Sequence, residues 1–89
     1  MEVNRKKVFE FLQQFGMDAL VADGFDDAIV GVVADDEHPK VVYDSYKCID
    51  ILIKEGMKED EAAEYFDYNV AGSYVGELTP IFIYPISKI

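Results

Sequence analysis

The segment AIVGVVADDEHPKVVYD, residues 28–44, decides the fold, because it predicts two strands joined by a tight turn. The apolar runs 28–34 and 40–44 flank the turn-forming residues DDEHP at 35–39. This spacing is typical of a β-hairpin with antiparallel strands. The first run is apolar on both faces, so we expect a central strand covered on both sides. Gly31 in its middle predicts a bulge or a close neighbour.

Apolar residues at helical spacing precede the hairpin. They predict a helix that begins at Asn4, whose side chain can cap it, and ends at Gly16 in a left-handed turn. The apolar face of this helix comprises Val8, Phe11, Leu12 and Phe15. Residues 17–27 contain Gly24 and several aspartates, and we expect them to form a loop.

Two further helices are predicted after the hairpin. Asp44 or Ser45 can cap a helix over residues 46–55, which Gly56 ends. Residues 58–70 predict another helix, whose acidic first turn suits the positive end of the helix dipole. We expect its inward face to consist of Ala62, Ala63, Phe66, Asn69 and Val70.

The last predicted element is a strand over residues 81–84. Pro80 has no backbone N–H to donate to a sheet, so it belongs at the start of this strand. The predicted order is therefore α-β-β-α-α-β, an α+β fold with a small, three-stranded, mainly antiparallel sheet and three helices. Residues 1–89 are long enough for a single domain with one modest core.

The charge of the chain restricts its partners. A formal net charge of −10, from 18 acidic and 8 basic residues, argues against binding a long nucleic acid, which requires many Lys and Arg side chains. It leaves open a small anion in a local pocket, or a basic protein partner. We expect a small chain like this to gain stability as a homo-oligomer.

The apolar runs are too short to cross a membrane, and the lone Cys48 cannot form an internal disulfide. We therefore expect no membrane partner and a reducing, cytoplasmic location.

Residues suited to catalysis or metal binding are sparse. His38 is the single histidine and Cys48 the single cysteine, and they are not near each other in the sequence. We expect a surface histidine and a buried cysteine, not a nucleophile with its base. The acidic residues around the first strand do not match a calcium loop, and zinc would lack ligands. We therefore expect no enzyme activity, no metal and no cofactor.

The segment FDYNVAGSYVGELTPIF, residues 66–82, is the strongest candidate for a binding site. Its apolar residues suit the core, and its glycines and Pro80 suit the path of the chain. The remaining polar and aromatic residues are Tyr68, Asn69, Tyr74, Glu77 and Thr79. By residue chemistry alone, a structural role is favoured, in which Asn69 binds loop backbone around Gly72. The alternative is that these residues face a ligand, with tyrosines stacking on an aromatic ring.

Three consecutive cations open the first predicted helix. Arg5, Lys6 and Lys7 oppose the helix dipole there. They form a solvated helix end, a contact for an anion, or a contact with the acidic body of the protein itself.

Three segments resemble a family of small bacteriophage proteins. They are DDAIVGVV (26–33), VVYDSYKCIDIL (41–52) and EAAEYFDYNVAGSYVGELTPIF (61–82). The most specific residues are Tyr68-Asn69, Gly72, Tyr74, Gly76-Glu77 and Thr79-Pro80. Some small phage proteins of this kind act as sponges, which bind the cyclic dinucleotides or cyclic oligonucleotides of the bacterial CBASS antiphage system and keep its effectors inactive.

The resemblance implies a non-catalytic, phage-encoded protein of immune evasion that holds a cyclic nucleotide, and a symmetric oligomer would suit a near-two-fold ligand. Tyr68 and Tyr74 would stack on bases, and Asn69, Glu77 and Thr79 would read base edges. Arg5 or Lys7 would meet a phosphate. The alternative function is an acidic inhibitor that mimics nucleic acid or blocks a basic host protein, which the net charge of −10 favours.

Overall fold

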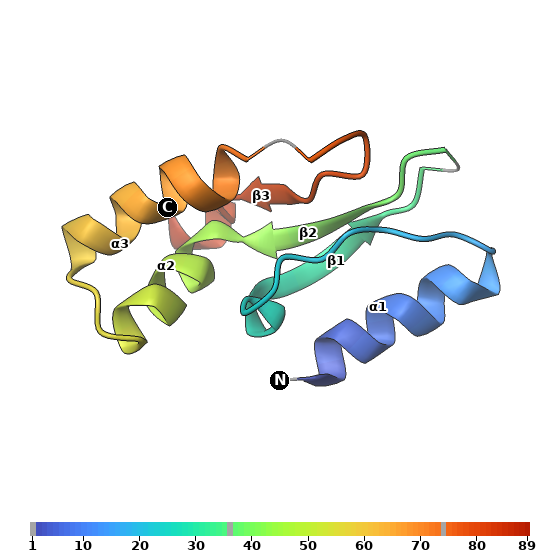
Figure 1. Ribbon diagram of the computed structural model, residues 1–89. Coiled ribbons are helices and arrows are strands. Elements are labelled where there is room, and N and C mark those ends of the chain that lie inside the picture. Colours follow the sequence, from blue (N-terminus) through green and yellow to red (C-terminus); the bar gives the residue numbers. More distant parts are fainter. Residues whose placement is uncertain (1, 36, 74) are drawn as a thin grey trace.

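The computed structural model describes residues 2–35, 37–73 and 75–89 (Figure 1). Within these ranges the chain forms three α-helices and a three-stranded mixed sheet in the order α-β-β-α-α-β, which confirms the predicted α+β fold. The elements are α1 (Glu2–Gln14), η1 (Asp26–Ala28), β1 (Ile29–Val33), β2 (Lys40–Asp44), α2 (Ser45–Lys54), α3 (Glu59–Tyr65), η2 (Phe66–Ala71), β3 (Ile81–Ile83) and η3 (Ile86–Lys88). None of the described helices is long and apolar enough to cross a membrane.

The hairpin forms as its sequence predicts. β1 pairs with β2 in antiparallel orientation, and the register shifts between Ile29 and Gly31, so the predicted bulge is confirmed. β3 pairs with β2 in parallel orientation, which makes the sheet mixed and not mainly antiparallel. The reason is the connection: two helices separate β2 from β3, and such a crossover returns the chain in the same direction.

The prediction that the first strand is central is wrong. The strand order is β1-β2-β3, so β2 lies in the middle and β1 at an edge. Val30 and Val33 of β1 remain 51% and 40% exposed. The apolar run was a correct sign of a strand, but its position depends on where β3 joins the sheet, which is a contact distant in sequence.

The core lies between one face of the sheet and the helices. Tyr43 of β2 is fully buried, stacks on Phe82 of β3 at 5.2 Å, and accepts a 2.7 Å hydrogen bond from the backbone N–H of Ala22. Phe66 packs edge-on against the same Phe82 ring. The buried apolar residues are Val8, Leu12, Phe25, Ala28, Val41, Tyr43, Cys48, Leu52, Ala62 and Phe66.

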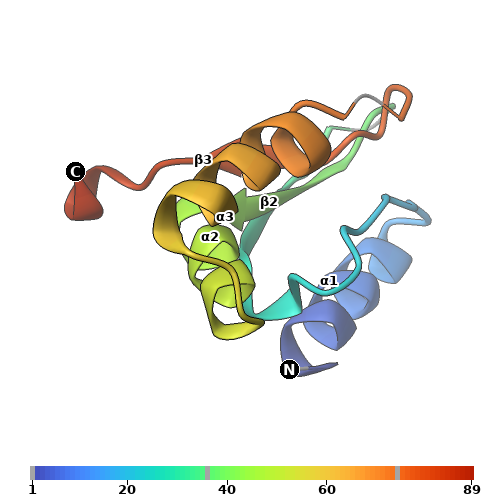
Figure 2. The ribbon, with the colours of Figure 1, turned by 60° about the vertical axis from the view of Figure 1, so that its left-hand side comes forward.

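Helix α1 contacts the rest of the molecule along a narrow stripe. Of its predicted apolar face, Val8 and Leu12 are buried, whereas Phe11 and Phe15 pack on each other in solvent. Figures 1 and 2 show the segment 17–25 running between α1 and the sheet, and α1 also contacts η1 and β1. The predicted cap at Asn4 is also wrong, because Asn4 lies inside α1 and its amide donates to the Asp26 carbonyl.

Asp44 is the N-cap of α2, which confirms one of the two predicted caps, Asp44 and Ser45. Its carboxylate accepts a 3.2 Å hydrogen bond from the Lys47 N–H and a 2.6 Å bond from the Lys88 ammonium of η3. The Asp44 side chain is 3% exposed and that of Lys88 is 41% exposed. Burial acts to raise the pKa of Asp44, but the hydrogen bonds from the Lys88 ammonium and from the backbone together lower it below its ordinary value. This ion pair ties the C-terminal turn to the start of α2.

Residues 58–70 are helical as predicted, but the second half has π geometry. α3 continues directly into η2, a π-helix that ends beside Gly72. A Cβ atom on Gly72 would lie 2.7 Å from the Asp67 carbonyl oxygen, so the chain passes close to its own backbone here. Gly72 therefore has the geometric role predicted from the sequence.

We expect Gly72→Ala to lower the free energy of unfolding by about 1 kcal/mol, because the overpacking cost exceeds the gain from a stiffer unfolded chain. Urea unfolding followed by circular dichroism measures it. Gly31→Ala is the matched control, since a Cβ there meets nothing within 4 Å. Equal stability of the two variants would contradict a tight approach at Gly72.

Candidate functional site

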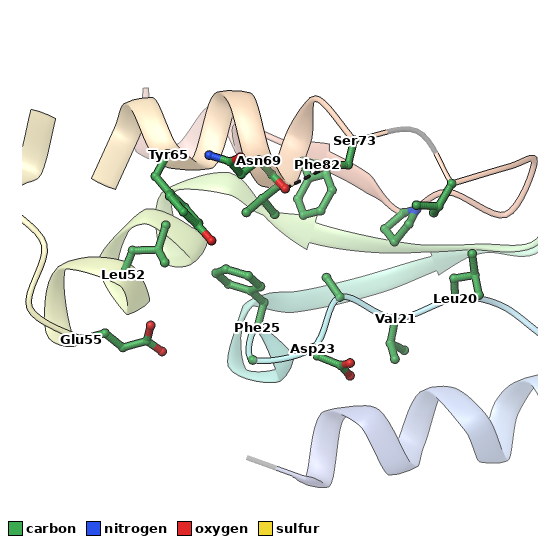
Figure 3. Close-up of a pocket in the computed structure, with 15 residues that line it drawn as sticks. Leu20, Val21, Asp23, Phe25, Leu52, Glu55, Tyr65, Asn69, Ser73 and Phe82 are labelled. Atoms are coloured by element: carbon green, nitrogen blue, oxygen red, sulfur yellow. Dashed lines mark hydrogen bonds between the residues drawn. The ribbon is translucent and has the colours of Figure 1, made fainter. Parts of the chain in front are cut away.

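A pocket of about 600 Å³ lies between the segment 20–25 and the η2–β3 side of the molecule (Figure 3). Three aromatic side chains line it, from different elements: Phe25, Tyr65 and Phe82. Aliphatic walls come from Leu20, Val21, Leu52, Val70, Val75 and Pro80. Its size falls within the range of small-molecule sites in proteins.

The aromatic side chains form the middle of the pocket. Figure 3 shows the Phe25 ring projecting from the segment 20–25 toward the Tyr65 hydroxyl, which extends down from α3. Phe25 is 9% exposed and Tyr65 is 43% exposed, so Phe25 is part of the core while Tyr65 offers a free surface. A flat ring inserted here would contact both side chains and Phe82.

Polar groups surround the apolar walls. Asp23 and Glu55 contribute carboxylates, Asn69 an amide and Ser73 a hydroxyl, which donates a 3.0 Å hydrogen bond to the Asn69 carbonyl. Among the described lining residues, no Lys, Arg or His side chain is present. The polar groups therefore suit N–H donors of a ligand better than phosphate oxygens.

Arg5 reaches the edge of this pocket from outside. Its guanidinium binds Asp23, a lining residue, at 3.0 Å and also Asp26 at 3.0 Å. Hydrogen bonds to Asp23 and then Asp26 raise the pKa of Arg5 above its ordinary value. The Asp23 side chain is 91% exposed and that of Asp26 is 18% exposed. The Asp26 contact is therefore the stronger anchor, and the contact to Asp23 is exchangeable.

Asn69 is the predicted site residue that lines the pocket. It was expected on the inward face of its helix, one turn after Phe66, and this is wrong: Phe66 is buried but Asn69 is exposed. The π geometry of η2 adds about one residue to each turn, which moves Asn69 away from the position below Phe66.

Tyr68 lies outside the aromatic pocket. It is 75% exposed and borders a separate shallow hollow with Tyr65 and Asn69. The other residues around this hollow are acidic: Asp60, Glu61 and Glu64.

Glu77 and Thr79 already have partners within the chain. The Glu77 carboxylate lies 2.6 Å from Nε2 of His38, which joins the hairpin turn to the loop before β3. The Thr79 hydroxyl donates to the Gly76 carbonyl and accepts from the Val75 N–H, so it shapes that loop. Tyr74 lies outside the described residues.

The structure does not bring the predicted cations to the segment 66–82. Arg5 is held by Asp23 and Asp26, and Lys7 is exposed on α1. Figures 1 and 2 both show α1 apart from α3 and η2. Only Arg5, through Asp23, is connected to the pocket.

The sequence pattern does not identify Phe25, Tyr65 and the segment 20–25 as parts of a site, because residues 17–27 predict a plain loop. An aromatic residue between Gly24 and Asp26 was the available signal, since a large apolar side chain in a polar loop needs a partner. The partner itself, Tyr65 on α3, is not visible in the local pattern.

Cys48 is fully buried, as predicted, and burial raises the pKa of its thiol to about 12. A protonated, enclosed thiol does not act as a nucleophile at neutral pH.

The chain matches no model of a protein family, and neither the curated proteins nor the solved structures contain a match.

Proposed function

We propose that the protein binds and sequesters a cyclic di- or oligonucleotide signal of bacterial antiphage defence, without cleaving it. It would be phage-encoded, act in the cytoplasm of the host and compete with the CBASS effectors for their signal. The sequence resemblance supports the class of ligand, and the pocket between Phe25, Tyr65 and Phe82 is the single structural observation that supports a site for it.

The pocket suits a purine base better than a phosphate. Its aromatic walls match the flat face of a base, and stacking of this kind contributes about 1–3 kcal/mol per base. The carboxylates of Asp23 and Glu55 and the side-chain amide oxygen of Asn69 can accept hydrogen bonds from exocyclic amines. One base of the ligand would enter, and the phosphates would stay at the solvent side.

Arg5 is the proposed phosphate contact. The ion pair with the half-buried Asp26 would keep the Arg5 side chain in place. A phosphate of the ligand would replace the exposed Asp23 carboxylate as the second partner of the guanidinium. Lys7 lies two residues after Arg5 on α1 and is exposed. It would add only long-range electrostatic attraction for the ligand.

Several features support binding without catalysis. The Cys48 thiol is enclosed and protonated, and the His38 ring is held by Glu77, a residue that does not line the pocket. The pocket acids Asp23 and Glu55 would then serve as hydrogen-bond acceptors and not as a general acid and base.

A thermal shift with cyclic di- and trinucleotides tests the proposal. At a ligand concentration of about 100 Kd the bound state gains about 2.7 kcal/mol, which corresponds to a rise in Tm of about 10 °C or more. We expect the nucleotide to be recovered intact after heat denaturation. Recovery of hydrolysed nucleotide would show an enzyme instead, and no shift with any nucleotide would remove the sponge function.

A second candidate function is an acidic inhibitor of a basic protein. The observation that favours it is the hollow formed by Asp60, Glu61 and Glu64 beside Tyr65 and Tyr68, which suits a Lys or Arg side chain. Two results together would support this function. An oligoarginine peptide should bind in a salt-sensitive manner, and the double variant Glu61→Lys with Glu64→Lys should abolish this binding. None of the cyclic nucleotides should raise the Tm.

A further inference from the structure

Glu55 presents a free carboxylate to the aromatic pocket. It lines the pocket together with Asp23. Arg5 binds Asp23, whereas no residue of the described ranges forms a hydrogen bond or an ion pair with the Glu55 side chain. Glu55 also borders a neighbouring hollow with Lys47 and Lys54, and neither lysine forms an ion pair with it. Glu55 is therefore the pocket carboxylate that is available to a ligand without the loss of an existing contact.

The position of Glu55 in the fold is unfavourable for a negative charge. Glu55 is the C-cap of α2, and its backbone N–H binds the Ile51 carbonyl. The carbonyl end of a helix carries a partial negative charge, so an acidic side chain there lowers the stability of the helix. The side chain is exposed and makes no compensating contact with the part of the chain that the structure describes. Folding alone therefore does not explain a carboxylate at this position.

Hydrogen-bond acceptors and donors lie on different sides of the pocket. Figure 3 shows the carboxylates of Glu55 and Asp23 on one side and the Asn69 amide on the other. The Phe25 ring and the Tyr65 hydroxyl lie between them. A carboxylate only accepts hydrogen bonds, whereas an amide and a hydroxyl can also donate them. A base in this pocket therefore needs donors on the edge that meets the carboxylate and acceptors on the other edge.

Guanine has this arrangement of donors and acceptors. Its Watson–Crick edge carries two adjacent donors, N1–H and the N2 amine, which together match the two oxygens of a carboxylate. Its O6 and N7 atoms are acceptors. Adenine, cytosine and uracil each place an acceptor beside the donor on the Watson–Crick edge, so a carboxylate that binds the donor also meets a lone pair. The groups of the pocket therefore favour guanine over the other bases.

We propose that the aromatic pocket selects guanine and that Glu55 determines this specificity. The inference rests on the proposed nucleotide-binding function and names the base that enters the pocket. The Glu55 carboxylate accepts hydrogen bonds from N1–H and from the N2 amine, while the ring stacks against Phe25 and Tyr65. The Asn69 amide donates to O6 or N7.

Three cyclic dinucleotides that differ only in their bases test the proposal, and isothermal titration calorimetry measures each affinity. Cyclic di-GMP should bind about 10- to 100-fold more tightly than cyclic di-AMP, because a two-point contact to the correct base discriminates by this order. Cyclic di-IMP keeps N1–H but lacks the N2 amine. It should bind about 10-fold more weakly than cyclic di-GMP, since one hydrogen bond to a charged group is lost.

Glu55→Gln tests the residue. The amide keeps one acceptor oxygen and places a donor at the other position, so the affinities for cyclic di-GMP and cyclic di-AMP should come within about 3-fold of each other. The Tm of this variant without ligand should equal or exceed that of the wild type, because a charge that opposes the helix dipole is removed. Glu10→Gln is the matched control: it removes the same charge from an exposed residue of α1 outside the pocket and should leave the preference unchanged.

The outcomes separate this inference from the proposed function. Equal affinity of the wild type for all three dinucleotides, or tighter binding of cyclic di-AMP, would overturn the selection of guanine and leave the nucleotide-binding function intact. A guanine preference that survives Glu55→Gln would overturn the role of Glu55. If no nucleotide of the thermal-shift panel binds, the proposed function itself fails and the selection of guanine fails with it.

Discussion

Replacing Lys88 by methionine is expected to lower the free energy of unfolding by about 3 kcal/mol at neutral pH. The substitution keeps the length of the side chain but leaves the Asp44 carboxylate, 3% exposed, with its backbone hydrogen bonds and no counterion. Breaking a fully buried ion pair costs about 3–5 kcal/mol, and the lower end applies here because the Lys88 side chain is 41% exposed.

Lys6→Met is the matched control for this variant. It removes the same positive charge from an exposed position on α1, so it reproduces the change in net charge without touching Asp44. Urea unfolding of both variants at pH 7 separates the local ion pair from general repulsion within an acidic chain. Equal destabilisation by the two substitutions would show that the Lys88–Asp44 contact contributes nothing specific.

The effect of Lys88→Met should depend on pH with a defined sign. In the wild type the pKa of Asp44 is below its ordinary value, so the folded state is stabilised above the unfolded pKa of about 3.9 and loses this stabilisation as the pH falls through the folded pKa. Without Lys88, burial favours the protonated acid. The stability difference between wild type and variant should therefore be largest near pH 7 and shrink below about pH 4. A difference that is constant down to pH 3 would contradict this assignment.

Tyr65→Ala is expected to weaken binding of the cyclic nucleotide by about 10- to 100-fold, because it removes one stacking surface of the pocket. The side chain is 43% exposed, so its loss should affect folding less than its loss from the core would. Isothermal titration calorimetry with the nucleotide that gives the largest thermal shift measures the affinity, and Tm without ligand reports on folding.

Two other tyrosines make this experiment decisive. Tyr84→Ala is the matched control: Tyr84 is 46% exposed and packs against Tyr46, outside the pocket. Tyr68→Ala distinguishes the pocket from the stretch implied by the sequence resemblance. A larger loss of affinity from Tyr68→Ala than from Tyr65→Ala would move the site to the acidic hollow, where Tyr68 lies.

Local patterns predicted most of the fold because they depend on residues close in sequence. The hairpin, the bulge at Gly31, the cap at Asp44 and the positive φ angle that ends α1 at Gly16 all follow from short-range chemistry. The errors share a different cause. Whether β1 lies at an edge, and whether Phe11 and Phe15 meet the core, is determined by which distant element packs there.

The candidate site was predicted only in part for the same reason. The sequence pointed to residues 66–82, and Asn69 does line the pocket. Glu77 and Thr79 appeared free, yet His38 and the backbone around Gly76 occupy them. Phe25 and Tyr65 come from segments 40 positions apart, and their proximity could not be predicted from periodicity.

By itself, then, the sequence determined the class of fold, the order of its elements and the acidic character of the chain, because these follow from composition and near-neighbour spacing. The tertiary structure alone decided which strand is central, which sheet face stays open, and which aromatic side chains enclose a pocket. These depend on how β3 and the segment 20–25 return to the hairpin, and the free energy of such long-range packing is not encoded in any one stretch of the chain.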